Sequence, residues 1–238
     1  MIAHADITAL LPGGEGDWIV GFADLGGLLH ERYAGHPFAI VIGRRLDDAI
    51  MDDVADGPVR AYYDHYRDIN RRLSDAVRAV ADRVRRDGFD CRSVEPTVLD
   101  EQVAADYMET MRLDFSHKMA ATRAGLGWIG KTDLFVSERF GPRLRLATVL
   151  ADREVAPAGT PVTESRCGAC ALCVERCPAK AATGKLWSIT VDRDEFYDPW
   201  KCREKCRELA RTRIGVNESI CGICVSVCPV GRAGAGAI

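Results

Sequence analysis

Nine of the ten cysteines in this 238-residue chain lie after residue 166, and seven of these form two dense groups. The segment CGACALCVERCP, residues 167–178, holds four of them, and CGICVSVCP, residues 221–229, holds three. Thiolates are soft ligands that select zinc, copper(I) and iron–sulfur clusters. The part of the chain after residue 166 is therefore expected to bind metal.

The spacing of the first group favours iron–sulfur clusters. Cys167-x2-Cys170-x2-Cys173-x3-Cys177-Pro178 is the run found in bacterial [4Fe–4S] ferredoxins, whose fourth cysteine ligates a second cluster. Short gaps let one loop offer three thiolates to one cluster. Pro178 has no N–H and prevents the loop from continuing regularly.

The second group repeats the end of this run but lacks one upstream cysteine, because Ile220 and its neighbours supply none. Cys202 can complete it. Exchange between the groups then gives two sets of four ligands. One set is Cys167, Cys170, Cys173 and Cys228, and the other is Cys177, Cys202, Cys221 and Cys224. The alternatives are two zinc sites or a disulfide knot, but zinc commonly uses paired Cys-x2-Cys knuckles, which neither group forms.

Cys206 belongs to neither of these two ligand sets. It follows Cys202 by four residues, so it shares a face with Cys202 if residues 200–213 are helical. It could replace Cys202 as a ligand, react near a cluster, or be a spare buried thiol, and the last reading is preferred. Six basic and two acidic residues between Lys201 and Arg213 form either a solvated face or a docking patch for an acidic electron donor.

The composition is that of an ordinary globular protein, with 47% hydrophobic and 28% charged residues. The formal net charge of −3 gives no footprint for nucleic acid. The apolar run at 38–43 is too short to span a bilayer, and the N-terminus lacks a signal-peptide pattern. We therefore expect a cytoplasmic protein without membrane contact, in which clustered thiols bind metal rather than form disulfides.

The uneven distribution of cysteine predicts two domains, at 1–160 and 161–238, divided in the turn-rich stretch APAGTPVTES. Residues 59–88 predict one long amphipathic helix, closed by Gly88. Its apolar positions recur in steps of three and four: Tyr62, Tyr66, Ile69, Leu73, Val77, Val80 and Val84.

Three further runs read as strands, at 38–43, 133–137 and 143–152. Residues 116–125 predict a short helix with Ser116 as its N-cap and Gly125 past its C-terminus. Helices and strands alternate, so the first domain is expected to be of the α/β (α+β) class.

Between the short helix and the strands lies AGLGWIGK, residues 124–131, with three glycines in six residues. It fits neither GxGxxG nor the Walker phosphate loop. Glycines let a backbone approach a ligand closely, but they also form tight packed turns. On the residues alone, both readings stay open.

The segments HKMAATRAGLGWIGKTDLFVSERFGPRLRLATVLAD and SRCGACALCVERCPAKAATGKLW resemble the epoxyqueuosine reductase family, and in particular the short proteins usually grouped beside it. The likeness runs from about Tyr62 to Cys228. It implies a nitroreductase-like, cobalamin-binding type of domain followed by a double-cluster ferredoxin-like domain. In that family, and in the related reductive dehalogenases, the clusters feed electrons to a corrinoid that reduces the substrate.

Two departures limit what the resemblance implies. The chain stops ten residues after Cys228, where tRNA-acting members continue into a helical-repeat domain, so we do not expect tRNA as the substrate. The family's proton-donating aspartate precedes the AGLGW stretch, and the nearest candidate here is Asp114, at shorter spacing. Asp114 could instead cap the following helix, and His117 is a second candidate acid.

Two functions follow. The favoured one is an iron–sulfur reductase with two [4Fe–4S] clusters and a cobalamin, or as second choice a flavin. That cofactor is expected to pack against Gly125, Gly127, Trp128, Gly130 and Lys131. The substrate would be a small molecule or a modified nucleoside, and the electrons would come from a low-potential donor of the ferredoxin or flavodoxin type. The alternative is a non-catalytic ferredoxin-like electron carrier that docks a redox partner.

Overall fold

The computed structural model describes residues 1–97 and 106–232, and the chain divides into two compact units. The sheet unit comprises Met1–Arg45, Ile69–Leu126 and Arg145–Val162. The cysteine unit comprises Leu46–Asp68, Gly127–Leu144 and Thr163–Ile238. Each unit is described by itself.

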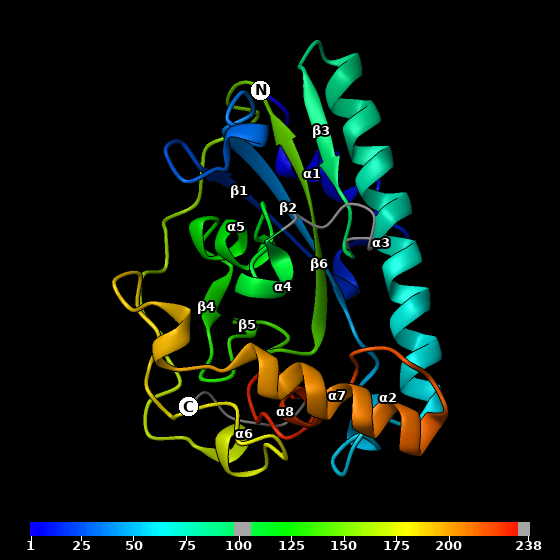
Figure 1. The fold of residues 1–238 in the computed structure, drawn as a ribbon. Helices are drawn as coiled ribbons and strands as arrows, with labels where there is room; N and C mark the ends of the chain where they lie inside the picture. Colours follow the sequence, from blue (N-terminus) through cyan, green and yellow to red (C-terminus); the bar gives the residue numbers. More distant parts are fainter. Residues whose placement is uncertain (98–105, 233–238) are drawn as a thin grey trace. The chain divides into compact units, whose positions relative to one another are not determined.

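A four-stranded sheet in the order β1-β2-β6-β3 forms the centre of the sheet unit (Figure 1). Its strands are β1 (Trp18–Asp24), β2 (Phe38–Arg45), β3 (Cys91–Val94) and β6 (Leu144–Ala151). β1 pairs antiparallel with β2, Trp18 facing Arg44, and β3 pairs antiparallel with β6, Cys91 facing Ala151. The centre of β2, Ile40–Ile42, is fully buried, which explains its unbroken apolar run.

The helices of this unit are α1 (His4–Thr8), α4 (Tyr107–Thr110), α5 (His117–Arg123) and the larger part of α3 (Arg60–Arg86). Short 3₁₀ turns lie at Gly14–Asp17 and Glu31–Tyr33. α5 contacts β1 and β2. Ser116 caps α5 by accepting a hydrogen bond from the Met119 N–H at 3.2 Å, and Gly125 follows with φ +74°. Both features agree with the sequence prediction.

The long helix α3 is amphipathic as predicted. Its apolar positions are buried, except for half-buried Tyr66, and Gly88 after its C-terminus takes φ +84°. Cys91, the isolated cysteine, is buried next to this helix and donates to the Ala81 carbonyl at 3.4 Å. Burial raises the pKa of the Cys91 thiol, so it remains protonated as part of the core.

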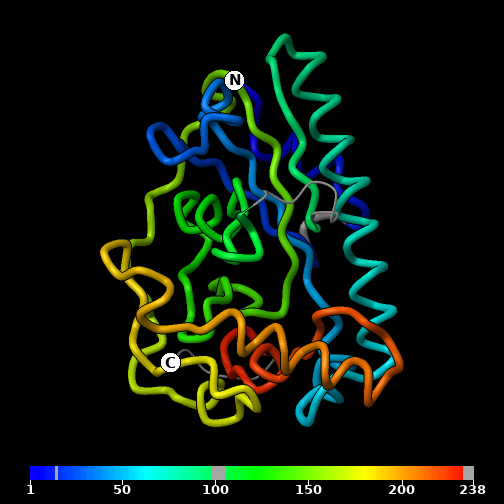
Figure 2. Tube along the Cα trace, in the orientation of Figure 1, coloured from blue at the N-terminus to red at the C-terminus, as the bar shows by residue number. Residues whose placement is uncertain are grey.

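The cysteine unit is made of short elements. They are α2 (Asp48–Asp52), β4 (Gly127–Ile129), β5 (Phe135–Ser137), α6 (Leu172–Glu175), a 3₁₀ turn (Arg193–Glu195), α7 (Pro199–Ile214) and α8 (Ile223–Ser226). β4 and β5 pair antiparallel, and α8 contacts both α2 and α6. Figure 2 shows the three stretches of this unit by colour, with residues 46–68 in cyan, 127–144 in green and the rest from yellow to red.

Both units mix helix and strand, which confirms the expected α/β (α+β) class. The last division between the units, after Val162, lies close to the boundary predicted near residue 160. Two earlier stretches nevertheless belong with the cysteines, Leu46–Asp68 and Gly127–Leu144. The cysteine loops carry little apolar surface, and these stretches supply packing partners for them. Among the described helices, none has the length and apolarity that crossing a bilayer would need.

Candidate iron–sulfur site

All nine cysteines after residue 166 lie in the cysteine unit, and the loops of the two groups are built on one plan. The first loop turns through a hydrogen bond from Cys170 N–H to the Cys167 carbonyl at 3.2 Å and continues into α6. The second turns at Gly222, with φ +87°, and continues into α8. Each short helix ends just before the cysteine that precedes a proline, Cys177 or Cys228.

The thiols of the two loops lie near one another. Burial raises the pKa of the Cys228 thiol to about 11, and three neighbouring thiols contribute: Cys173, Cys167 and Cys170. Burial likewise raises the pKa of the Cys224 thiol, with contributions from Cys221, Cys202, Cys173 and Cys177. Cys228 therefore has the first three cysteines of the other loop as neighbours, whereas Cys224 has neighbours from both expected sets, and the division into sets stays a prediction.

This donor set fits two [4Fe–4S] clusters. Eight thiols in two groups match the ligand count of two cubanes. In the described part of the chain, no three Cys, His, Asp or Glu side chains come close enough to hold a single metal ion. A single zinc ion draws four ligands tightly together, whereas a cubane holds its cysteines farther apart. The cysteine count and spacing are what favour two clusters.

Cys206 lies beside the second set rather than among the cluster-facing thiols. Its sulfur is 3.7 Å from that of Cys202, closer than two corners of a cubane allow. Hydrogen bonds from Cys206 and Tyr197 lower the pKa of Cys202 to about 7, against the opposing effect of burial. Hydrogen bonds to Cys202 and Cys221 raise the pKa of Cys206 instead. Either sulfur can donate in the contact between Cys202 and Cys206, so Cys202 stays the expected ligand on its position in the cysteine spacing alone.

The segment Gly127–Lys131 contacts the first cysteine loop. The indole Nε1–H of Trp128 donates to the Cys167 sulfur at 3.3 Å. The Lys131 ammonium donates to the carbonyls of Gly168 at 3.0 Å and Cys170 at 2.9 Å. Both side chains are only 6% exposed. The Trp128 N–H and the Lys131 ammonium therefore donate hydrogen bonds to the cysteine loop, although these side chains were expected to contact a cofactor.

The glycines of the same stretch leave space for the chain's own backbone and side chains. A Cβ on Gly127 would overlap the Val136 carbonyl oxygen, and one on Gly130 would lie 3.0 Å from a Val136 methyl. In the sheet unit, a Cβ on Gly125 would lie 2.7 Å from the Thr160 carbonyl oxygen. These contacts support the tight-turn reading of the glycines.

The two candidate acids lie in the sheet unit. An Asp114 carboxylate oxygen is 3.3 Å from an Arg32 guanidinium nitrogen, and Ser116, not Asp114, caps α5. Asp114 stays a prediction as a proton donor.

Both ring nitrogens of His117 are engaged. Nδ1 lies 2.8 Å from the Thr148 hydroxyl, and Nε2 lies 2.9 Å from the Glu95 carbonyl oxygen, to which it must donate. Burial lowers the pKa of His117 from 6.5 to about 4. These contacts favour a neutral, structural imidazole over a catalytic acid.

His117 predicts a pH dependence of stability. The folded state disfavours protonation of the His117 ring. The contribution of the neutral ring to the free energy of unfolding is therefore complete above pH 6.5 and is lost as the pH falls toward 4. Between pH 6.5 and about 5, the loss should be roughly 2 kcal/mol. Thermal midpoints measured across this range should fall more steeply for the unmodified protein than for His117→Gln. Equal slopes would contradict the assignment.

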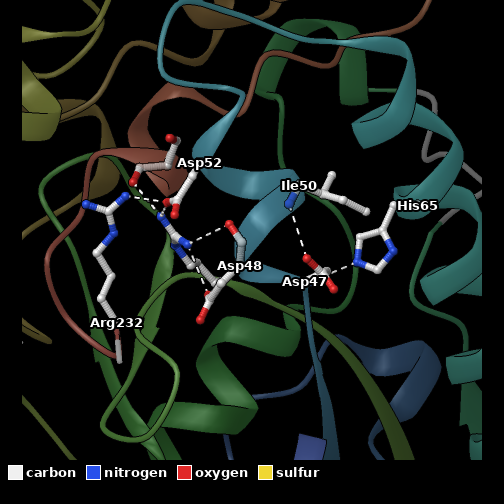
Figure 3. Close-up of polar contacts among 8 residues, drawn as sticks. Asp47, Asp48, Ile50, Asp52, His65 and Arg232 are labelled. Atoms are coloured by element: carbon white, nitrogen blue, oxygen red, sulfur yellow. Dashed lines mark hydrogen bonds and ion pairs between the residues drawn. The ribbon is translucent and has the colours of Figure 1, made fainter. Parts of the chain in front are cut away.

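A buried cation that the sequence did not single out holds the second cysteine loop. Arg143 is 1% exposed and donates to the Ser226 carbonyl in α8 at 2.9 Å. Its guanidinium also lies 3.0 Å from an Asp48 carboxylate oxygen and 2.6 Å from one of Asp52. Figure 3 shows these two carboxylates, with Arg232 reaching Asp52 from another side. Arg143 has this role through residues that are distant in sequence, so no local sequence pattern predicts it.

Comparison with known proteins agrees with this geometry. The family described as "4Fe-4S double cluster binding domain" matches residues 166–231. An epoxyqueuosine reductase of Pseudomonas aeruginosa is 26% identical over 203 residues, covering 81% of this chain and 51% of the relative. A tetrachloroethene reductive dehalogenase of Dehalobacter restrictus is 34% identical over 121 residues, covering 45% of this chain and 21% of the relative. The chain is related to both enzyme families. This confirms the resemblance expected from the sequence.

A solved reductive dehalogenase extends the likeness to the fold. Its structure, described as suggesting a mechanism for B12-dependent dehalogenation, superposes with a TM-score of 0.66 at 18% identity. The match covers 91% of this chain and 30% of the dehalogenase. At this identity, the match establishes the shared fold alone. Because the chain spans only 51% and 21% of the two curated relatives above, their activities are not transferred with it.

Proposed function

We propose that this protein is an iron–sulfur oxidoreductase that passes electrons through two [4Fe–4S] clusters to a corrinoid-dependent reduction. The observation that carries the proposal is the match of residues 166–231 to a double-cluster binding domain, and the proximity of Cys228 to the thiols of the first loop supports it. When bound, each cluster would supply one-electron transfer at low potential. The substrate class is a small molecule or a modified nucleoside, not tRNA, and the donor is a ferredoxin or flavodoxin.

The chain's own residues hold and shield the clusters. Four thiolates would bind each cluster, Trp128 and Tyr197 hydrogen-bond one ligand sulfur in each set, and Lys131 fixes the first loop. Asp114 is proposed as the proton donor to the reduced substrate.

The proposal that a corrinoid takes part rests on a different observation. A B12-dependent mechanism is described for the related dehalogenase, and this chain shares its fold. Yet Gly127, Gly130 and Lys131 contact other residues of their own unit, so the expected cofactor contacts have no support from this stretch. The same observation favours a second candidate function, an electron carrier that holds clusters only.

Metal analysis tests the common part of both functions. Anaerobically purified protein should contain about eight iron and about eight sulfide per chain, four of each for every cluster. Cys91→Ser is a matched control, because Cys91 lies in the core of the other unit, and it should keep the full content. Stoichiometric zinc without sulfide would overturn the iron–sulfur assignment.

Titration with cob(II)alamin then separates the two functions. The reductase predicts a saturable change in the corrinoid spectrum by a protein that already holds both clusters. A fully loaded protein with no affinity for cobalamin or flavin would establish the electron carrier instead. Gly127→Leu is a poor probe of this site, because its side chain would displace β5 whether or not a cofactor binds nearby.

A further inference from the structure

One end of the stretch 127–141, which we call the clamp segment, lies on the first cysteine loop. The Trp128 N–H donates to the Cys167 sulfur at 3.3 Å. The buried Lys131 ammonium donates to two backbone carbonyls of the same loop, at 3.0 and 2.9 Å. A Cβ on Gly130, between these two residues, would lie 3.8 Å from the Cys167 sulfur. This end of the clamp segment therefore fixes both a sulfur and the backbone of the loop.

The other end of the clamp segment lies against the chain that follows Cys228. Gly141 has φ +57°, and a Cβ there would overlap the Val230 carbonyl oxygen. A Cβ on Gly231 would in turn overlap the Phe140 carbonyl carbon. The two backbones are packed without room for a side chain between them, so this contact sets the path of the chain just after Cys228.

Backbone pairing makes the connection between the two ends stiff. β4 and β5 are paired, with Gly127 opposite Ser137. Ser137 and Gly141 then exchange backbone hydrogen bonds of 2.9 and 3.0 Å. The hydroxyl of Ser137, a fully buried residue, also accepts a hydrogen bond from the Phe140 N–H at 2.8 Å. The two ends of the clamp segment therefore keep a fixed separation.

We propose that the clamp segment positions the ligands of the first cluster, by holding the first cysteine loop at one end and Cys228 at the other. The first cluster is predicted to take three ligands from that loop and its fourth from Cys228, so the four thiolates fit a cubane only if these parts keep their spacing. In this role Trp128, Lys131 and Gly141 are positioning residues outside the cysteine motifs. The inference rests on the two-cluster part of the proposed function and not on the corrinoid.

Removal of iron from the anaerobic holoprotein by a chelator tests the inference, with each cluster followed by electron paramagnetic resonance after reduction. The signal that Cys173→Ala lacks identifies the first cluster. Lys131→Met keeps the side-chain volume but removes the cation, and it should lose that signal about tenfold faster, because groups that orient metal ligands contribute at least that factor to metal affinity. Trp128→Phe removes the N–H and should act in the same direction. The second cluster should be lost at the unmodified rate.

Gly141→Ala tests the other end of the clamp segment. Its methyl group would meet the Val230 carbonyl, so the chain there must shift, and the first cluster should again be lost faster. Two matched controls should keep the unmodified rates for both clusters. Gly184→Ala adds a methyl at φ +92° with open space around it. Lys180→Met removes the hydrogen bond of an exposed lysine to the Glu175 carbonyl.

The inference is overturned if Lys131→Met and Gly141→Ala hasten the loss of both clusters equally, because a segment that only stabilises the unit would weaken both. It is also overturned if either folded variant affects the second cluster alone or neither cluster. Where one of these variants yields no folded protein, Trp128→Phe decides by the same criterion. Failure of the proposed function is distinguishable, because an unmodified protein without iron and sulfide would give neither signal.

Discussion

Cys202→Ser should reduce the iron content from about eight to about four per chain, whereas Cys206→Ser should leave both clusters in place. Serine retains the size of cysteine but is a poor ligand for iron. Cys202 is the thiol found beside Cys224, and hydrogen bonds lower its pKa to about 7. Cys206 is not a member of the expected ligand sets and only hydrogen-bonds Cys202 and Cys221, so its loss should remove hydrogen bonds and leave the ligands in place.

The two variants are matched, because both cysteines lie on one face of α7 and their sulfurs are 3.7 Å apart. Iron and sulfide analysis together with resonance spectra of the reduced proteins gives the readout. Cys206→Ser should shift at most the potential of the second cluster. Loss of a cluster in Cys206→Ser, with full content in Cys202→Ser, would reverse the ligand assignment.

Local patterns predicted the elements that local physics determines. The steps of three and four along α3, the Ser116 cap of α5 and the apolar run of β2 are all confirmed. The cysteine spacing predicted the double-cluster domain because the ligand geometry of a cubane is encoded in gaps of two and three residues.

The roles of Trp128, Lys131 and Arg143 depend on contacts between distant segments. Trp128 lies 39 residues from Cys167, and Arg143 lies 83 residues from Ser226. A glycine-rich stretch indicates only that another group lies close to its backbone. At Gly127 and Gly130 the neighbour is the Leu134–Ser137 stretch of the same hairpin, and no pattern within AGLGWIGK distinguishes that from a cofactor.

Arg143→Met should destabilise the cysteine unit by roughly 2–4 kcal/mol, although methionine retains much of the side-chain volume. The change removes four donated contacts, to Asp48, Asp52 and the Ser226 carbonyl. The carboxylates are 28% and 54% exposed, so water can recover much of their solvation. Ser226 is 1% exposed, and the loss of this donor from its carbonyl accounts for much of the cost.

Arg232→Met is the matched control. Arg232 also binds Asp52, but its side chain is 40% exposed, and exposed ion pairs contribute about 0–1 kcal/mol. Thermal unfolding under anaerobic conditions should therefore show a midpoint lowered by roughly 10 °C for Arg143→Met and by only a few degrees for Arg232→Met. Equal shifts would show that the ion pair with Asp52, rather than the buried anchor, dominates.

The position of α8 gives Arg143→Met a second effect. This helix contains Cys224 and ends two residues before Cys228, and the two cysteines are predicted to belong to different ligand sets. Loss of the hydrogen bond to the Ser226 carbonyl should make α8 more mobile and should therefore expose both clusters to oxidation. In air, the visible iron–sulfur absorption of Arg143→Met should disappear several times faster than that of Arg232→Met. Both clusters should be lost. Bleaching of one cluster alone, or at the rate of Arg232→Met, would mean that Arg143 stabilises α2 without holding the loop that joins the two sets.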